Sequence, residues 1–194
     1  MIKYLIFDLS EVLIRGLIGV EGKLAEKLQI PEKIILKSFA SKDLESLCLG
    51  NISETEYLNQ IIKSENWPIS ISELKILIRD NFKIEISQMV DFVKQLKKKY
   101  ILFLCSDHCR EWIEYIEEYH SFLELFSRKY YSFENKSLKS DHQTFLNIVK
   151  ENKLQPEEVV FIDDNVLNTK TAEKVNIRSV IFHNYEQLRK ELKF

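Results

Sequence analysis

The sequence predicts an α/β fold in which a doubly wound parallel sheet is interrupted by a helical insert. Three observations support this prediction. Two apolar runs, residues 2–7 and 159–162, stop abruptly at aspartate, as buried parallel strands do at their carboxyl ends. After residue 87, further apolar runs alternate with amphipathic helical patterns. Between the first strand and this region, residues 21–86 show helical periodicity alone.

The first strand is expected over residues 2–7, with Asp8 directly after it. The chain has only four glycines, and Gly16, Gly19 and Gly22 fall in one stretch just beyond this strand. Glycine permits backbone conformations that other residues avoid. The cluster therefore indicates a hinge or flap, with an irregular connector as the alternative.

The block that follows contains two helix starts of the same kind. Ser53 and Ser70 each precede a glutamate three residues later, the pattern of a capping box. A block of four or five helices is too long for an ordinary crossover connection. We therefore expect residues 15–86 to form an inserted helical cap, and residues 1–14 and 87–194 to form the sheet domain.

The remaining strands are expected over residues 101–105, 129–133, 159–162 and 179–182. Helical patterns separate these strands, and a terminal helix is expected over residues 185–192. The sheet should therefore hold about five or six strands.

Composition restricts the function classes. The chain has 28 Lys and Arg against 30 Asp and Glu, a formal net charge of -2, so no broad basic field favours a nucleic-acid or membrane partner. No apolar stretch reaches the length of a transmembrane span, and the chain enters a strand without a signal peptide. Three cysteines without metal-type spacing favour a reducing compartment. We expect a cytoplasmic monomer or homodimer.

Chemically useful side chains fall at or near the predicted strand ends: Asp8, Ser106, Lys139, Asp163 and Asp164. In open α/β sheets the ligand site lies beyond the carboxyl ends of the strands. Three carboxylates there would repel one another without a cation, and Mg²⁺ prefers such oxygen ligands. An aspartate can attack phosphorus, while a hydroxyl and an ammonium can hold the phosphoryl oxygens.

These motifs resemble those of the haloacid dehalogenase superfamily over essentially the whole chain. Residues 6–13 are similar to its first motif, 104–107 to the second, 139–141 to the third and 161–165 to the fourth. The insert lies where the subfamily with a small helical cap carries its cap. The resemblance implies a Rossmann-like core and Mg²⁺-dependent hydrolysis of a small phosphorylated metabolite through an aspartyl-phosphate.

The resemblance also implies a role for each matching residue. Asp8 would be the nucleophile, with Ser106 and Lys139 holding the phosphoryl group. The catalytic residues it implies are Asp8, Ser10, Ser106 and Lys139. The substrate-binding residues are Ser106, Asp107 and Lys139. The Mg²⁺ site would comprise Asp8, the backbone carbonyl of Ser10, Asp163 and Asp164.

Ser10 departs from the pattern, because phosphatases of the superfamily usually have a second aspartate there. Loss of a positioned general acid/base lowers a rate by roughly 10²–10⁴. A substrate with a good leaving group would be less affected. Glu11 is adjacent, but neighbouring side chains on an extended segment diverge.

Three hypotheses follow from Ser10. The first is a slow or specialised phosphatase. The second is a catalytically weak relative that senses phosphate or acts as a scaffold. The third is a dehalogenase, which attacks carbon without a metal. Retention of both Asp163 and Asp164 argues against the third hypothesis, because unpaired acids without a cation are costly.

The remaining polar candidates are the histidines and Arg15. His108 follows the second motif, where it would contact substrate or simply begin a helix. His120, His142 and His183 have no partners at ligand spacing and are expected at the surface. Arg15, just past the first motif, would pair with an anionic part of a substrate or remain solvated.

Overall fold

The structure is a computed structural model that describes residues 1–193. Its centre is a five-stranded parallel sheet in the order β3-β2-β1-β4-β5. The strands are β1 (Tyr4–Phe7), β2 (Ile101–Ser106), β3 (Arg128–Tyr131), β4 (Val159–Asp163) and β5 (Arg178–Ile181). The predicted α/β class is confirmed, and every neighbouring strand pair is parallel.

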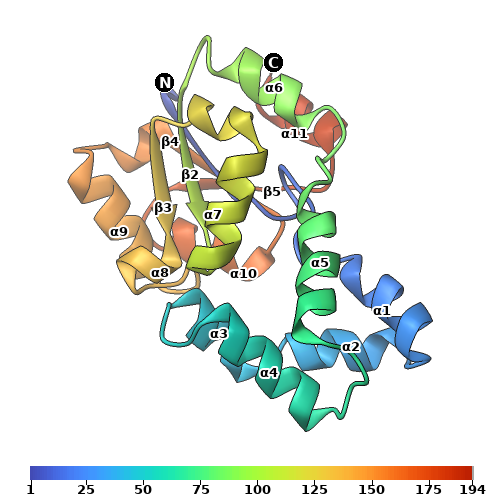
Figure 1. Ribbon diagram of the computed structural model, residues 1–194. Helices are drawn as coiled ribbons and strands as arrows, with labels where there is room; N and C mark the ends of the chain where they lie inside the picture. Colours follow the sequence, from blue (N-terminus) through green and yellow to red (C-terminus); the bar gives the residue numbers. More distant parts are fainter. Residues whose placement is uncertain (194) are drawn as a thin grey trace.

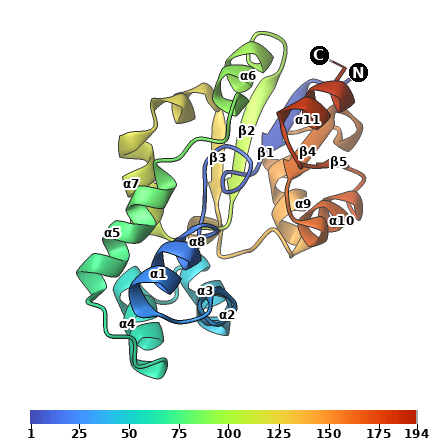
Figure 2. The same ribbon diagram turned by 90° about the vertical axis from the view of Figure 1, so that its right-hand side faces the viewer.

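Helices cover both faces of the sheet, which gives three layers (Figure 2). One face packs against α6 (Met89–Leu96), α7 (Arg110–Tyr119) and α11 (Tyr185–Glu191). The other face packs against α9 (His142–Glu151) and α10 (Val166–Glu173). Leu5 and Phe7 of β1 enter the first core, and Ile6 between them enters the second. This burial on both faces explains why the strands are continuous apolar runs.

The segment between β1 and α6 forms a second lobe below the sheet in Figure 1. It contains α1 (Val20–Leu28), α2 (Glu32–Phe39), α3 (Lys42–Cys48), α4 (Glu54–Ser64) and α5 (Ile71–Phe82). We call residues 15–86 the helical insert. Both predicted capping boxes are present: Ser53 with Glu56 begins α4, and Ser70 with Glu73 begins α5. The division into a cap and a sheet domain stays a prediction.

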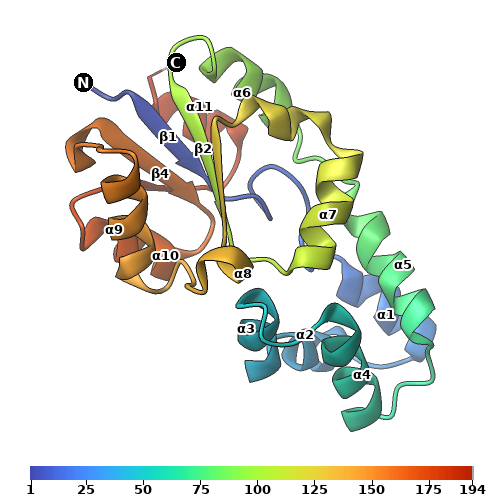
Figure 3. The same cartoon turned by 60° about the vertical axis from the view of Figure 1, so that its left-hand side comes forward.

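The strand order places the ligand edge of the sheet. From β1 the chain builds outward through β2 and β3, then returns to the other side of β1 with β4 and β5. The order therefore reverses between β1 and β4, the position at which such sheets bind ligands. The carboxyl ends of the strands point toward the helical insert (Figure 1). Figure 3 shows α5, the last helix of the insert, between α7 and the other insert helices.

Two predictions were wrong in detail. The strand expected over residues 129–133 ends at Tyr131, because the short helix α8 (Ser132–Asn135) begins there. His120 was expected at the surface but is buried, 3% exposed. Its ring has polar partners that permit burial: Nε2 lies 2.8 Å from the Phe82 carbonyl oxygen and Nδ1 lies 3.4 Å from Glu85. His142 and His183 are exposed, as expected.

No helix within residues 1–193 is long and apolar enough to cross a membrane.

Candidate active site

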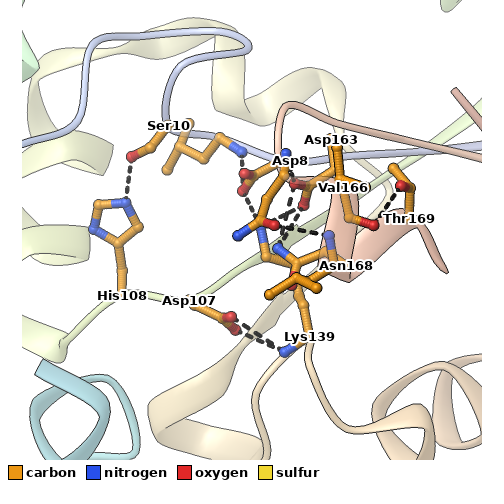
Figure 4. Close-up of polar contacts among 12 residues, drawn as sticks. Asp8, Ser10, Asp107, His108, Lys139, Asp163, Val166, Asn168 and Thr169 are labelled. Carbon is orange, nitrogen blue, oxygen red and sulfur yellow. Dashed lines mark hydrogen bonds and ion pairs between the residues drawn. The ribbon is translucent and has the colours of Figure 1, made fainter. Parts of the chain in front are cut away.

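Four segments bring the predicted site residues to one edge of the sheet (Figure 4). Asp8 directly follows β1, Ser106 is the last residue of β2, and Asp163 is the last residue of β4. Lys139 comes from the loop between α8 and α9. Because β1 pairs with both β2 and β4, the three strand ends are adjacent.

Lys139 links the two buried aspartates. Its Nζ lies 2.6 Å from Oδ1 of Asp8 and 2.7 Å from Oδ2 of Asp163. All three side chains are buried. Burial alone would lower the pKa of Lys139, but the surrounding carboxylates, Asp163 first, raise it well above its ordinary value. The ammonium therefore stays charged and fixes the orientation of Asp8.

Asp8, Asp163 and Asp164 form a group of carboxylates whose ligand oxygens all lie within 4.8 Å of one another. Burial, despite the opposing charge of Lys139, raises the pKa of Asp8 well above its usual range. Desolvation and the nearby Asp163 raise the pKa of Asp164 to about 6. One lysine thus leaves the three acids incompletely neutralised. A hard divalent cation held by carboxylate oxygens fits this site.

The buried carboxylate of Asp163 is held on several sides. Its Oδ1 accepts a hydrogen bond from the backbone N–H of Asn165 at 2.7 Å. The side-chain amide of Asn168 donates to both oxygens, at 3.3 and 3.2 Å. Asn165 also accepts a hydrogen bond from the backbone N–H of Leu167 and so begins α10. The start of α10 and the orientation of Asp163 are therefore fixed together.

Ser106 has a buried hydroxyl that finds no hydrogen-bond partner within the described part of the chain. An unpaired buried hydroxyl costs about 1–3 kcal/mol, so its position calls for a polar ligand. The next residue, Asp107, accepts hydrogen bonds from the backbone N–H of Lys139 at 3.2 and 3.1 Å. The carboxylate of Asp107 thus holds the Lys139 loop in place.

Ser10 is paired with a histidine from a distant segment. Ser10 Oγ lies 2.6 Å from Nε2 of His108, which is buried, and Nδ1 of His108 has no partner among the described residues. Burial, followed by the charge of Lys139, lowers the pKa of His108 to about 3, so the ring is neutral at ordinary pH. The rings of Phe82 and Trp112 lie edge-on to it. The Ser10 hydroxyl is therefore fixed by a neutral imidazole.

Most of these residues line a cavity of about 520 Å³, a size typical of small-molecule sites, whereas Ser106 and Asp163 are buried and do not contribute to its lining. Asp8, Ser10, Asp107, Lys139 and Asp164 all contribute to its lining. The apolar lining comes from both lobes, and its members are Leu17, Ile18, Leu44, Trp112, Leu138 and Leu167. The cavity is therefore lined by the helical insert and by the sheet-bearing part of the chain, and the candidate site residues Asp8 and Lys139 are in that lining.

The sequence analysis named His108 but missed its pairing with Ser10, and it missed Asn168 and Trp112 altogether. The pairing of His108 with Ser10 joins segments 98 residues apart, so no local pattern reveals it. Asn168 lies one turn beyond the Asn165 that begins α10, which is a weak signal in the sequence. Trp112 lines the cavity although helical spacing alone assigns it to a core. Arg15 lies outside the lining and pairs with Glu11 at 2.7 Å.

Comparison with known proteins gives the family. A sequence profile described as haloacid dehalogenase-like hydrolase matches residues 24–182, more than half of the chain. The chain belongs to the haloacid dehalogenase-like hydrolase family. Asp8 and Ser10 lie before the matched range, so the evidence that places them in the candidate site is the geometry described above. A search of curated proteins finds none that matches this chain.

Solved structures of haloacid dehalogenase-like proteins share the fold. A HAD family enzyme from Bacteroides thetaiotaomicron, in complex with magnesium and inorganic phosphate, is 22% identical with a TM-score of 0.75, over 97% of this chain and 99% of that one. A predicted HAD-like family hydrolase from Porphyromonas gingivalis is 20% identical with a TM-score of 0.78, over 100% and 99%. L-2-haloacid dehalogenase from Xanthobacter autotrophicus, with chloropropionic acid covalently bound, is 15% identical with a TM-score of 0.71, over 99% and 82%.

Proposed function

We propose that this protein hydrolyses small phosphomonoesters in a magnesium-dependent reaction through an aspartyl-phosphate on Asp8. The observation that carries the proposal is the buried Ser106 hydroxyl, which is unpartnered among the described residues and lies at the end of β2, next to the end of β1 that carries Asp8. A tetrahedral phosphoryl group would supply the oxygen partner that this hydroxyl lacks. Membership of a hydrolase family supports the same reaction class.

The residues divide the chemistry between them. Asp8 attacks phosphorus with a carboxylate oxygen, and the bond from phosphorus to the leaving oxygen breaks. Lys139 orients Asp8 and, together with Ser106, offsets charge on the phosphoryl oxygens. Water then attacks the acyl-phosphate, releases inorganic phosphate and restores the Asp8 carboxylate. Closure of the helical insert over the cavity would exclude bulk water during these steps.

Magnesium would be held by Asp8, Asp163 and Asp164, with the backbone carbonyl of Ser10. Bound there, the ion neutralises the carboxylates and the phosphoryl group together. The grouping of three carboxylates supports this assignment. The related enzyme from Bacteroides thetaiotaomicron crystallised with magnesium and inorganic phosphate, which is consistent with the proposal.

The assay that tests this function uses p-nitrophenyl phosphate with and without Mg²⁺. This ester has a good leaving group, so turnover does not depend on the general acid that Ser10 cannot supply. Turnover should require Mg²⁺ and should disappear in Asp8→Asn, because an amide is not a nucleophile toward phosphorus. Circular dichroism should show that this nearly isosteric variant keeps the fold. Full activity in Asp8→Asn would exclude Asp8 as the nucleophile.

A second substrate separates the alternatives. Release of chloride from 2-chloropropionate without Mg²⁺ would assign the protein to the dehalogenase branch, which one of the similar structures represents. Inactivity toward both substrates, with retained binding of inorganic phosphate, would support a sensing or scaffolding role instead.

A further inference from the structure

Apolar side chains from separate segments form part of the lining of the active-site cavity. Ile18, ahead of α1, is 51% exposed, and Leu167, in α10, is 68% exposed, yet both line the cavity. Leu17 and Leu44 line it from the helical insert. A single exposed leucine needs no explanation, but apolar side chains gathered around one cavity from separate segments indicate a surface that a ligand covers.

The charges in this cavity are unsuited to a second anionic group. Lys139 is the only lysine or arginine among the described lining residues, and Asp8 and Asp163 already pair with it. Glu45 adds negative charge to the lining, where Glu11 is paired with Arg15. A carboxylate or second phosphate on the substrate would therefore lose its water without gaining a cation. Charge complementarity favours a substrate that is neutral beyond its phosphoryl group.

An aryl group meets the remaining requirements. Trp112 is in the lining but is only 2% exposed, so an aromatic leaving group would pack mainly against the apolar side chains of Ile18, Leu44 and Leu167. Ser10 provides no carboxylic acid to protonate a leaving oxygen. A phenolate departs without that proton far more readily than an alkoxide does, since phenols are the stronger acids. The apolar lining and the serine thus point to the same class of leaving group.

We propose that the substrate is a phosphate monoester of an uncharged phenol, and that Ile18, Leu44 and Leu167 bind its ring. This inference rests on the proposed function and names the substrate class of that site. Hydrolysis breaks the bond between phosphorus and the phenolic oxygen. Water supplies the oxygen of the released phosphate and, after proton exchange with solvent, the proton of the phenol.

Two esters of similar leaving-group acidity isolate the effect of charge. These are 4-carbamoylphenyl phosphate and 4-carboxyphenyl phosphate, of which only the second carries an additional negative charge. We expect kcat/KM with Mg²⁺ to be roughly tenfold or more higher for the neutral ester, because the cavity leaves the carboxylate unpaired. Equal values, or a preference for the carboxylate, would overturn the inference.

Variants of Leu167 test the apolar contact, and Leu146→Ser is the matched control. Leu146 is also exposed, in α9, and lies outside the cavity lining. Leu167→Ser should raise KM for 2-naphthyl phosphate roughly fivefold while changing kcat little, as loss of an apolar contact in a pocket does. Leu146→Ser should change neither value. Equal kinetics in the two variants would contradict the assignment of Leu167.

A positive charge introduced at position 167 should shift the preference toward the charged ester. Leu167→Lys should raise kcat/KM for 4-carboxyphenyl phosphate relative to 4-carbamoylphenyl phosphate, because the new ammonium faces the carboxylate. An unchanged ratio in this variant would contradict the inference. The failures are distinguishable: no hydrolysis of any aryl phosphate with Mg²⁺ would overturn the proposed function and this inference with it. Hydrolysis of all esters without preference would overturn this inference alone.

Discussion

Under the proposed function Ser10 replaces the aspartate that would act as general acid, and its Oγ lies 2.6 Å from Nε2 of His108. Ser10→Asp should therefore raise kcat, most strongly for alkyl phosphates, whose poor leaving groups need a proton. The gain should be on the order of 10²-fold. Steady-state rates with an alkyl and an aryl phosphate give the comparison. Ser10→Asn is the matched control, because it has the same shape without an acid.

A gain that Ser10→Asn reproduces, or no gain in Ser10→Asp, would mean that the site is organised around the serine. The pairing of Ser10 with His108 gives a physical reason for such a result. A carboxylate at position 10 would face a neutral imidazole and would lie close to Asp8 in sequence, so its own charge would have to be accommodated there.

A substitution at Gly16 would show how closely the segment between β1 and α1 packs on Ser10. A Cβ at position 16 would lie 2.8 Å from both Cβ and Oγ of Ser10, closer than real contacts allow. Gly16→Ala should therefore displace Ser10 and lower kcat severalfold. The control is Gly22→Ala, where the nearest atom lies 3.7 Å away, at the start of α1. There alanine should be neutral or stabilise by about 0.5–1 kcal/mol. Similar kinetics for the two variants would contradict the close packing at Gly16.

At the scale of elements, one buried carboxylate joins three helices. Glu54 of α4 is ion-paired with Arg79 and with Lys75 of α5, the latter at 3.1 Å. It also accepts a hydrogen bond from the Trp112 indole of α7 at 2.8 Å. The backbone N–H of Glu54 donates to Glu111, also of α7. The helical insert is thus fastened to the sheet domain through Glu54.

Glu54→Gln should destabilise the protein by about 3 kcal/mol, because loss of one partner of a buried ion pair leaves the other unpaired. Urea unfolding at neutral pH measures this difference. Asp80→Asn, which removes the exposed pair of Asp80 with Lys83 on α5, is the control and should cost less than about 1 kcal/mol. Equal losses in both variants would argue against a fastening role for Glu54.

The same contact predicts a dependence on pH. Burial alone would raise the pKa of Glu54, but the bonds to Arg79, Lys75 and Trp112 together lower it below its ordinary 4.5. The folded protein therefore binds this proton less readily than the unfolded chain. The stabilisation is complete above pH 4.5 and is lost as the pH falls through the lowered pKa. The stability difference between the native protein and Glu54→Gln should shrink in that range, as urea unfolding at a series of pH values would show.

Elements set by local sequence were predictable, and those that depend on distant partners were not. Ser53 and Ser70 begin helices through contacts within four residues, so the pattern alone revealed them. The end of β3 was predicted two residues late, because Ser132 turns away to hydrogen-bond the Cys48 carbonyl of the insert at 2.6 Å. His120 is buried by carbonyl and carboxylate partners that the chain supplies from the end of the insert.

At the scale of the whole molecule, the order of the parallel strands brings residues that are far apart in the sequence together in one site. Asp8, Ser106 and Asp163 end neighbouring strands, so knowledge of the fold class was enough to predict that they meet. The cavity lining was not predictable in the same way. Leu44 and Leu167 come from different lobes, and their approach depends on how the insert sits against the sheet domain. The candidate site residues at the strand ends can thus be predicted from the sequence, whereas the residues that would determine substrate specificity can be identified only in the folded structure.

Binding of the proposed Mg²⁺ to the carboxylate group would be coupled to the stability of the whole fold. Repulsion among Asp8, Asp163 and Asp164 opposes folding in the absence of a cation. Mg²⁺ that binds only the folded state should stabilise it by about 2.7 kcal/mol at a hundredfold excess over its Kd. For a protein of this size that corresponds to a Tm increase of about 5–10 °C. Calorimetry with Mg²⁺, and again after addition of EDTA, measures the shift.

Asp164→Asn separates this effect from general salt stabilisation. Without Mg²⁺ the variant should melt at the same temperature as the native protein or higher, because one repelling charge is gone. With Mg²⁺ it should gain little, because a ligand is lost. Asp91→Asn, which alters an exposed carboxylate of α6 that pairs with Lys94, should keep the full Mg²⁺ response. An undiminished response in Asp164→Asn would place the ion elsewhere and remove the metal from the proposed mechanism.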